Sequence, residues 1–325
     1  MLLLGRDDIE ELLEPAATVA AVEAALIASS RGEVLQPLRT VLDLPSSAAS
    51  ALFMPAVLPA ADALGTKLVT IYPQNRRLGL PTHHGAVLLC DAATGRPTAL
   101  LEGAALTAVR TAAVTALATR LLARSDTRRL AVLGTGIQAE SHLPFLLAER
   151  DFTSVAIWSP QEASRQRFAQ CVETLVEVPL QVCDTAEEAV RGADVILTAT
   201  AAADPVVARD WIEPGAHLNA IGASTATRRE IDGPTVAASR LFVEQRAAAL
   251  AEAGDLLLAI EAGLVEATHI VAELGEVAVG DRPGRRSDDE ITLFKSVGLA
   301  IEDLAVARLA VDRAGRLDLG RRVDW

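Results

Sequence analysis

Three long cationic side chains occupy positions at which the sequence pattern predicts apolar packing. Lys67 lies in TKLVTIY, whose β-branched and aromatic residues predict a strand, and its side chain shares a strand face with Val69. Arg39 lies in QPLRTV, where it shares a predicted strand face with Val41. Arg110 lies in LTAVRTAAV, and its helical neighbours are leucine, alanine and valine. A cation on such a face is costly unless it meets an anion or polar partners.

Together the three cations suit the binding of a small carboxylate. The sequence shows no matching run of buried-looking carboxylates, so we expect the anionic partner to be a ligand. A charge-assisted hydrogen bond of this type contributes about 1.5–3 kcal/mol, and arginine offers the two-pronged geometry that a carboxylate needs. Lys67 is also a candidate proton donor, because desolvation lowers the pKa of a buried lysine towards a useful range. Taken singly, each side chain is equally compatible with a snorkelling or ion-paired cation.

Two adjacent histidines follow in PTHHG, but they do not predict a metal site. Side chains of neighbouring strand residues point to opposite faces, so His83 and His84 cannot bind one ion together. No cluster of cysteine, histidine or aspartate elsewhere in the sequence completes such a site. We expect no metal.

A glycine turn in the middle of the chain predicts dinucleotide binding. The strand-like run LAVL, residues 130–133, leads directly into GTGIQA and then into a helical stretch. In the pattern G-x-G-x-x-G/A, Gly134 makes the turn, Gly136 admits the pyrophosphate, and Ala139 packs helix against strand. The helix N-terminus then offers N–H groups to phosphate. The alternative is a tight turn that binds nothing.

The second strand of this pattern ends in SPQ, without the acidic residue typical of NAD sites. With no carboxylate to repel a 2′-phosphate, the sequence gives NADP(H) a slight preference over NAD(H). Arg165 and Arg167 are within reach of such a phosphate, although both are also compatible with a solvated helix face.

The elements that position these residues fall into two patterns. Helices are expected from Asp7 and over residues 18–30, followed by short β-runs over 38–44, 67–72 and 85–90, with a hairpin turn at 91–95. This block predicts an antiparallel, α+β domain. After a helix over 106–123, strands at 130–133, 154–158, 180–183, 195–200, 217–221 and 241–243 alternate with helices. That rhythm predicts an α/β domain with a parallel sheet, and residues 290–314 are expected to form a final amphipathic helix.

Composition limits the classes of partner. A formal net charge of -13 argues against nucleic acid and against an anionic membrane surface. The three cysteines are spread out without metal-like spacing, which fits a reducing cytoplasm. No uninterrupted apolar run approaches the roughly 20 residues of a membrane helix, and the start, MLLLGRDDIEELLE, is not a signal peptide. We expect a cytoplasmic protein.

Several motifs in one order resemble the ornithine cyclodeaminase/μ-crystallin family, and within it the ketimine-reductase branch. They are QPLRTV, ALGTKLVT, LTAVRTAAV, LGTGIQAESH, GADVILTAT, PGAHLNAIGAS and LFKSVGLAIEDLAVA, and they cover nearly the whole chain. The resemblance implies a homodimer of two-domain subunits. Residues 1–118 with 296–325 would form the α+β substrate-binding and dimerisation domain, and residues 119–295 a Rossmann-type, doubly wound α/β domain.

The resemblance also assigns residues to the site. Arg39, Lys67 and Arg110 match the family's substrate-carboxylate and catalytic positions, and Thr82 matches a substrate-side threonine. The residues assigned to the cofactor are Thr111, Gly134, Thr135, Gly136, Ile137, Gln138, Ser159, Thr198, Ala199, Thr200, Ala223, Ser224 and Ser296.

One departure from the cyclodeaminases bears on the reaction. Cyclodeaminases carry a catalytic aspartate in the segment that here contains Ser224, and Glu230 and Asp232 lie too far along to match it. The resemblance therefore favours an NAD(P)H-dependent reductase of small α-imino acids, such as Δ1-pyrroline-2-carboxylate, that yields L-amino acids. The alternatives are an amino-acid dehydrogenase of the alanine type, an ornithine cyclodeaminase, and a non-enzymatic crystallin-like binding protein.

Overall fold

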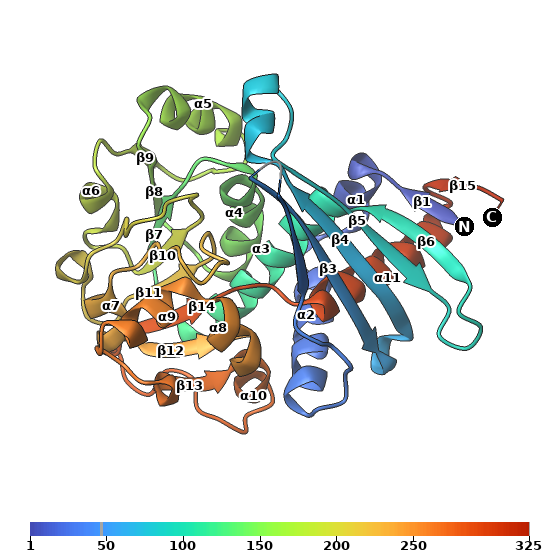
Figure 1. Ribbon diagram of the computed structural model, residues 1–325. Coiled ribbons are helices and arrows are strands. Elements are labelled where there is room, and N and C mark those ends of the chain that lie inside the picture. The colour runs from blue at the N-terminus through green and yellow to red at the C-terminus, as the bar shows by residue number, and fades with distance from the viewer. Residues whose placement is uncertain (46–47, 325) are drawn as a thin grey trace. The chain divides into compact units, whose positions relative to one another are not determined.

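The structure is a computed structural model that describes residues 1–45 and 48–324. It divides into two compact units (Figure 1), the first formed by residues 1–110 and 299–325 and the second by residues 111–298. The first border falls within helix α3 (Gly103–Leu122), which also contains the border expected after residue 118. The second falls between Gly298 and Leu299, directly before helix α11 (Ala300–Leu317).

The first unit is built on a seven-stranded sheet with the order β15-β1-β6-β5-β4-β3-β2. Strands β2 to β6 pair antiparallel, as the sequence predicted, while β1 runs parallel to β6. The bounds are β1 Leu2–Leu4, β2 Thr40–Leu44, β3 Ala49–Leu58, β4 Ala63–Ile71, β5 His83–Cys90, β6 Pro97–Glu102 and β15 Arg321–Arg322. The sequence analysis missed the short strands β1 and β15, and it missed β3 and β6 because their proline and alanine content weakens the β-pattern.

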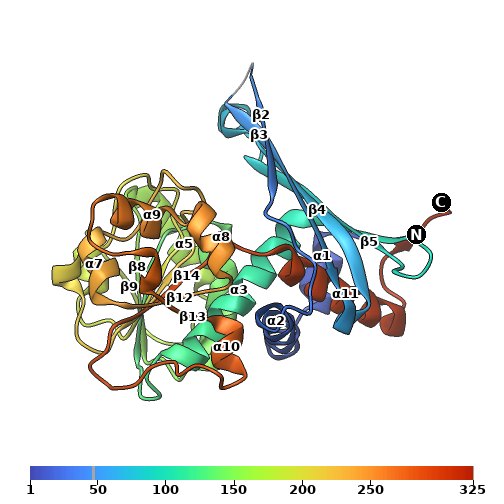
Figure 2. The ribbon, with the colours of Figure 1, turned by 60° about the horizontal axis from the view of Figure 1, so that its bottom comes forward.

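Helix α11 covers one face of this sheet. It lies along β3, β4 and β5 (Figure 2), and the helices α2 (Pro15–Ser30) and α1 (Arg6–Leu12) pack against α11. The alternation of strand residues puts Met54 and Ala56 of β3 and Val87 of β5 into this interface, where they are buried. The first turn of α11 therefore faces the interior beside β4.

The helix predicted over residues 290–314 is wrong in its first part. Residues Thr292–Lys295 form strand β14 of the second unit, and the helix begins only at Ala300. All four residues of β14 are buried, so its sequence lacks the strand alternation that would have separated it from a helix. Gly298, with φ 78°, breaks the chain between strand and helix.

The second unit confirms the predicted parallel sheet. Eight parallel strands follow the order β13-β12-β14-β11-β10-β7-β8-β9, so the strand order reverses direction between β7 and β10. Such a reversal marks the ligand site of doubly wound sheets. The strands are β7 Arg129–Leu133, β8 Ser154–Trp158, β9 Leu180–Val182, β10 Val195–Thr198, β11 His217–Ala220, β12 Arg240–Val243, β13 Ile270–Glu273 and β14.

Helices cover both faces of this sheet (Figure 1). They are α4 Ile137–Glu149, α5 Glu162–Val172, α6 Ala186–Val190, α7 Gly233–Ala238, α8 Arg246–Glu252, α9 Gly254–Glu261 and α10 Leu274–Ala278. By length and composition alone α3 could cross a membrane, but 83% of its apolar window is buried inside the structure. It is packed as a core helix.

Candidate active site

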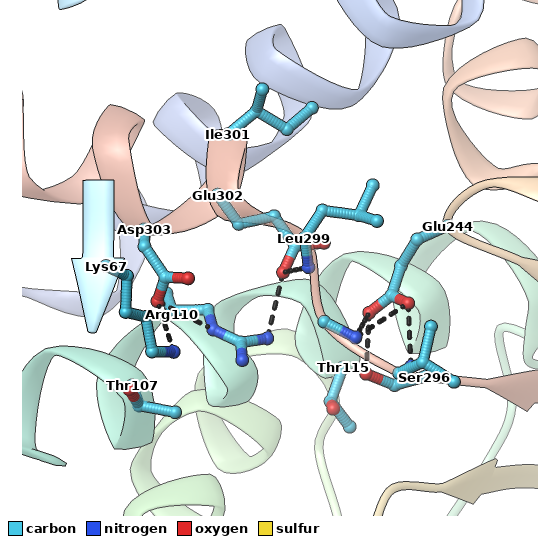
Figure 3. A network of polar contacts seen from close by, with 12 residues as sticks. Lys67, Thr107, Arg110, Thr115, Glu244, Ser296, Leu299, Ile301, Glu302 and Asp303 are labelled. Atoms are coloured by element: carbon cyan, nitrogen blue, oxygen red, sulfur yellow. Dashed lines mark hydrogen bonds and ion pairs between the residues drawn. The ribbon is translucent and has the colours of Figure 1, made fainter. Parts of the chain in front are cut away.

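Lys67 lies on the face of β4 that α11 covers. Its strand neighbours in register are Met54 and Val87, both buried, and Lys67 itself is only 2% exposed. Its Nζ donates a hydrogen bond to Oδ1 of Asp303, in the first turn of α11, at 2.9 Å (Figure 3). The expectation that Lys67 shares a buried apolar strand face is confirmed.

Arg110 of α3 meets the same helix end. Its Nε donates to Oδ1 of Asp303 at 3.2 Å, and its NH1 donates to Oε2 of Glu302 at 2.9 Å. Arg110 is 6% exposed, and both carboxylates are fully buried. One carboxylate oxygen of Asp303 therefore holds the lysine and the arginine together.

These carboxylates correct the sequence analysis, which expected no protein partner for the cations. Glu302 and Asp303 were overlooked because the sequence analysis placed them in the middle of a long amphipathic helix. Two adjacent acids in such a helix are expected on its solvent-exposed face. Only the true helix start reveals them as first-turn acids, whose negative charge the helix N-terminus favours.

The electrostatic environment of Lys67 combines opposing influences. Burial lowers the pKa of the Lys67 amine most, the charge of Asp303 raises it, and the charges of Arg110 and Arg39 lower it, with a result of about 8. The cluster of Lys67, Arg110, Arg39, Glu302 and Asp303 contains three bases and two acids.

Arg39 lies directly before β2 and is half-buried. The segment before it is fixed to α11, because the Ile301 N–H donates to Oε1 of Gln36 at 2.8 Å. The apolar face expected beside Arg39 is not buried within the described chain, since Val41 is 50% exposed. Strand β2 is an edge strand with one neighbour, β3, and four of its five residues are exposed.

Thr82 lies in the loop before β5, where its hydroxyl is 2.9 Å from Nδ1 of His83. Within the described part of the chain this hydroxyl makes no hydrogen bond to the Lys67 cluster, and its assignment to the substrate stays a prediction. No group of three or more histidine, cysteine, aspartate or glutamate side chains within residues 1–45 and 48–324 is arranged to hold a metal ion.

The glycine turn after β7 has the geometry that a dinucleotide requires. Gly134 adopts φ 122°, and a Cβ there would lie 2.4 Å from the carbonyl oxygen of Ala199. Gly136 is the N-cap of α4, and a Cβ there would meet only open space. Ala139 is fully buried between helix and sheet. These residues fit a pyrophosphate on the exposed helix N-terminus.

The end of β8 is joined to this turn. The Thr135 hydroxyl donates to the Ser159 hydroxyl at 3.2 Å, and the Gly134 N–H donates to the carbonyl of Trp158. Arg165, expected within reach of a 2′-phosphate, is instead buried and donates to the Ser159 carbonyl and to Asp184. It fixes the turn, and of the two arginines only Arg167 extends from an exposed position.

The loops after β10 and β11 are held by a buried carboxylate. Oε1 of Glu230 accepts from the Thr200 N–H and hydroxyl at 2.6 and 2.7 Å. Oε2 accepts from the Thr198 hydroxyl at 2.8 Å and from the Gly222 N–H at 2.6 Å. Burial raises the pKa of Glu230, whereas the nearby Lys295 lowers it. Four donors occupy the carboxylate, so it holds the loops together and is not available as a base in place of Ser224.

Lys295 and Asp255 complete this buried cluster. The Lys295 amine is 2.9 Å from Oδ2 of Asp255 and donates to the carbonyl of Ala220. Oδ1 of Asp255 accepts from the N–H groups of Glu230 and Ile231. The sequence analysis did not find this cluster, because Lys295 was placed in a helix.

Ser296, a predicted cofactor residue, is bonded to a carboxylate that the sequence analysis also missed. Its hydroxyl donates to Oε1 of Glu244 at 2.6 Å, and Oε2 of Glu244 accepts from the Val297 N–H at 2.8 Å (Figure 3). Glu244 directly follows the buried strand β12, which is the signal that could have identified it. Of the remaining assignments, Thr111 and Ala223 are buried, whereas Ile137 and Ser224 are exposed.

Comparisons with known proteins identify the family and relatives of this chain. The model of the ornithine cyclodeaminase/mu-crystallin family matches residues 1–316. A Δ1-pyrroline-2-carboxylate reductase of Bacillus cereus is 37% identical over 326 residues, covering 100% of both chains. The mouse ketimine reductase mu-crystallin is 39% identical over 313 residues, covering 95% of this chain and 96% of that protein.

Solved structures give the same result. The Δ1-pyrroline-2-carboxylate reductase of Thermococcus litoralis, in complex with NADH and L-proline, superposes with a TM-score of 0.96 at 36% identity, covering 99% of this chain and 100% of that one. An archaeal alanine dehydrogenase dimer with bound NAD superposes with a TM-score of 0.93 at 31% identity, covering 100% and 99%.

Proposed function

This chain belongs to the ornithine cyclodeaminase/mu-crystallin family, and from that premise we propose that it is an NAD(P)H-dependent reductase of small cyclic or linear α-imino acids. The substrate class is that of Δ1-pyrroline-2-carboxylate, and the products are L-amino acids. The observation that carries the proposal is the buried lysine and arginine, Lys67 and Arg110, that converge on one carboxylate oxygen of Asp303.

The guanidinium of Arg110 would bind the substrate's carboxylate. Arg110 is already oriented by Glu302 and Asp303, so little conformational entropy is lost when it binds an anion. Arg39, directly before β2, acts electrostatically on the same Lys67 amine and would be the second cation of the clamp. Orientation of the imino acid by such a clamp lowers the barrier by several kcal/mol.

Lys67 supplies the proton. An imine accepts hydride well only when its nitrogen is protonated or strongly hydrogen-bonded. With a pKa of about 8, the Lys67 amine is charged at neutral pH yet gives up its proton more readily than an exposed lysine does. Protonation by such a positioned group accelerates a reaction by about 10²–10⁴-fold.

The second unit holds the cofactor. When bound, the nicotinamide group supplies the hydride. Gly134, Gly136 and the N-terminus of α4 would hold the pyrophosphate, and the loops fixed by Glu230 would hold the nicotinamide half.

The end of β8 carries Ser159 and no carboxylate, and Arg167 on α5 is exposed, which supports acceptance of a 2′-phosphate. NADPH then supports turnover at least as well as NADH, and a kcat/KM for NADPH tenfold below that for NADH would contradict this.

The lyase alternative has little support in the site. Ring closure with loss of ammonia needs a carboxylate to accept the proton of the side-chain amine. The matching position is Ser224, and the nearest acid along the chain, Glu230, is fully buried and bonded to four donors.

A panel of imino and amino acids, assayed with NADH and NADPH at the reduced-nicotinamide absorbance band, tests the proposal. We expect Δ1-pyrroline-2-carboxylate and related imino acids to oxidise the cofactor. Ornithine converted to proline with catalytic NAD⁺ would indicate a cyclodeaminase instead. Steady NAD(P)⁺ reduction by alanine, without imine reduction, would indicate a dehydrogenase.

We further propose that two copies of the chain form a homodimer through the sheet of the first unit. The face of the sheet opposite α11 exposes Leu42, Phe53 and Leu68 by 53%, 39% and 37%, and Phe53 and Leu68 are neighbours in register. Leu35 and Leu38, before edge strand β2, are also more than half exposed. An apolar patch of this kind is typical of an interface. Light scattering should give twice the chain mass, and Leu42→Asp should shift it to the monomer.

A further inference from the structure

The chain contains only two lysines, Lys67 and Lys295, and both are buried and paired with an aspartate. We propose that Asp303 is a positioning residue of the reaction: it fixes the Lys67 amine beside Arg110 and keeps that amine charged until it delivers its proton. This inference rests on the proposed function, and no comparison with a known protein assigns Asp303 a role.

The geometry makes Asp303 the common anchor of the two cations. Oδ1 accepts from Lys67 Nζ at 2.9 Å and from Arg110 Nε at 3.2 Å, so both donors converge on one atom (Figure 3). The other oxygen, Oδ2, is buried and has no hydrogen-bond partner among the described residues. Within the described residues, the Asp303 carboxylate therefore accepts hydrogen bonds from these two side chains and from no other group.

The groups packed around Lys67 leave Asp303 as the residue that keeps it charged. The neighbouring strands contribute Met54 and Val87, which offer no charge, and burial among them disfavours the ammonium form. Arg110 from α3 and Arg39 from the segment before β2 oppose it as well, and Asp303 is the group that raises its pKa.

Glu302 provides a matched comparison on the same helix turn. It is equally buried, and its Oε2 accepts from Arg110 and from the Leu299 N–H, at the start of α11. Its hydrogen bonds go to Arg110 and to the helix start and not to Lys67, and Asp303 has the larger effect on the Lys67 pKa. Glu302 thus orients Arg110, whereas Asp303 serves both cations.

The first test is the pH profile of kcat/KM for imine reduction. The wild type should lose activity as pH rises through about 8, because the amine is then deprotonated. In Asp303→Asn the midpoint should fall by about 1–3 pH units, the effect of one close opposite charge. Asp303→Glu should restore it. Glu302→Gln should raise KM for the imino acid and move the midpoint less than Asp303→Asn does. Equal midpoints in wild type and Asp303→Asn, or an equal shift in Glu302→Gln, would overturn the inference.

The second test does not depend on activity. Lysine labelled with ¹³C at Cε gives signals from two residues, and Lys67→Arg identifies that of Lys67. Its titration midpoint, measured without substrate, should fall in Asp303→Asn, while the Lys295 signal keeps the wild-type position. If Asp303→Asn does not fold, as judged by circular dichroism, Asp303→Glu still decides, since it should preserve the wild-type midpoint. A shifted titration in an enzyme that reduces no imino acid would refute the proposed function and not the control of Lys67 by Asp303.

Discussion

The two lysine–aspartate pairs have the same separation and different surroundings. Lys67 and Asp303 in the first unit are 2.9 Å apart, as are Lys295 and Asp255 in the second, and all four residues are buried. Around Lys67 the additional charges include two arginines. Around Lys295 the additional group is the acid Glu230.

This difference distinguishes a cluster that can bind a ligand from a cluster that only holds the fold together. In the first cluster a lysine and an arginine share one carboxylate oxygen, and the charge of Arg39 acts on the same lysine. The second has an acid in excess, and backbone N–H groups and threonine hydroxyls occupy its oxygens. The geometry of a buried ion pair therefore does not reveal its role, whereas the balance of charge around the pair does.

Replacement of Lys67 by methionine should give the largest effect. The proton donor is lost, so kcat/KM for imine reduction should fall by about 10²–10⁴-fold. Thermal stability should change little, because Asp303 keeps Arg110 as a partner. Steady-state kinetics and circular dichroism melting measure the two effects, and full activity in Lys67→Met would remove the distinction between the clusters.

Lys295→Met should show the opposite pattern. Asp255 and Glu230 would remain buried without their cation, and a broken buried pair costs about 3–5 kcal/mol of unfolding free energy. Urea unfolding should show this loss. The folded fraction should retain the high-pH decline of imine reduction that Lys67 causes, and a changed decline would show that Lys295 takes part in proton transfer.

Glu230→Gln should have a smaller effect, on the cofactor. An amide nitrogen would face a donor in place of one carboxylate oxygen, and a hydrogen bond to a charged group contributes about 1.5–3 kcal/mol. We expect weaker NAD(P)H binding by fluorescence titration. The position of the high-pH decline should not move, since the hydrogen bonds of the Glu230 carboxylate go to Thr198, Thr200 and Gly222 of the second unit.

The mildest perturbation is pH itself. The folded-state pKa of Lys67 is lowered from 10.5 to about 8, so between these values the unfolded chain binds more protons than the folded one. This residue's contribution to stability therefore increases as pH rises through that window. Lys67→Met should remove that contribution, and melting curves of both proteins from pH 8 to 10.5 test it.

The sequence predicted the features that depend on local pattern. The strand carrying Lys67, the glycine turn and the parallel sheet of the second unit all follow from the spacing of residues in short windows. The carboxylate partners of Lys67 and Arg110 did not follow, because they lie 236 and 192 positions away along the chain. Only the fold brings such residues together.

The errors at the end of the chain have the same origin. Strand β14 is buried throughout, so nothing in its own residues separated it from the helix that follows. Because the helix was predicted to begin at residue 290, Lys295 was not recognised as a strand residue that could pair with Asp255. For the same reason Glu302 and Asp303 were not recognised as residues of a helix N-terminus. A single wrong boundary thus hid three of the charged groups on which the two clusters depend.

The burial of both lysines has a practical consequence for anyone who handles this protein. Acylating and cross-linking reagents that attack primary amines find no freely exposed lysine, and the N-terminal amine itself donates to the carbonyl of Val323. Cationic groups elsewhere on the surface are guanidinium groups, which hold their charge to high pH. An amine-directed label that inactivates the protein, and from which a bound imino acid protects it, would therefore report on one side chain.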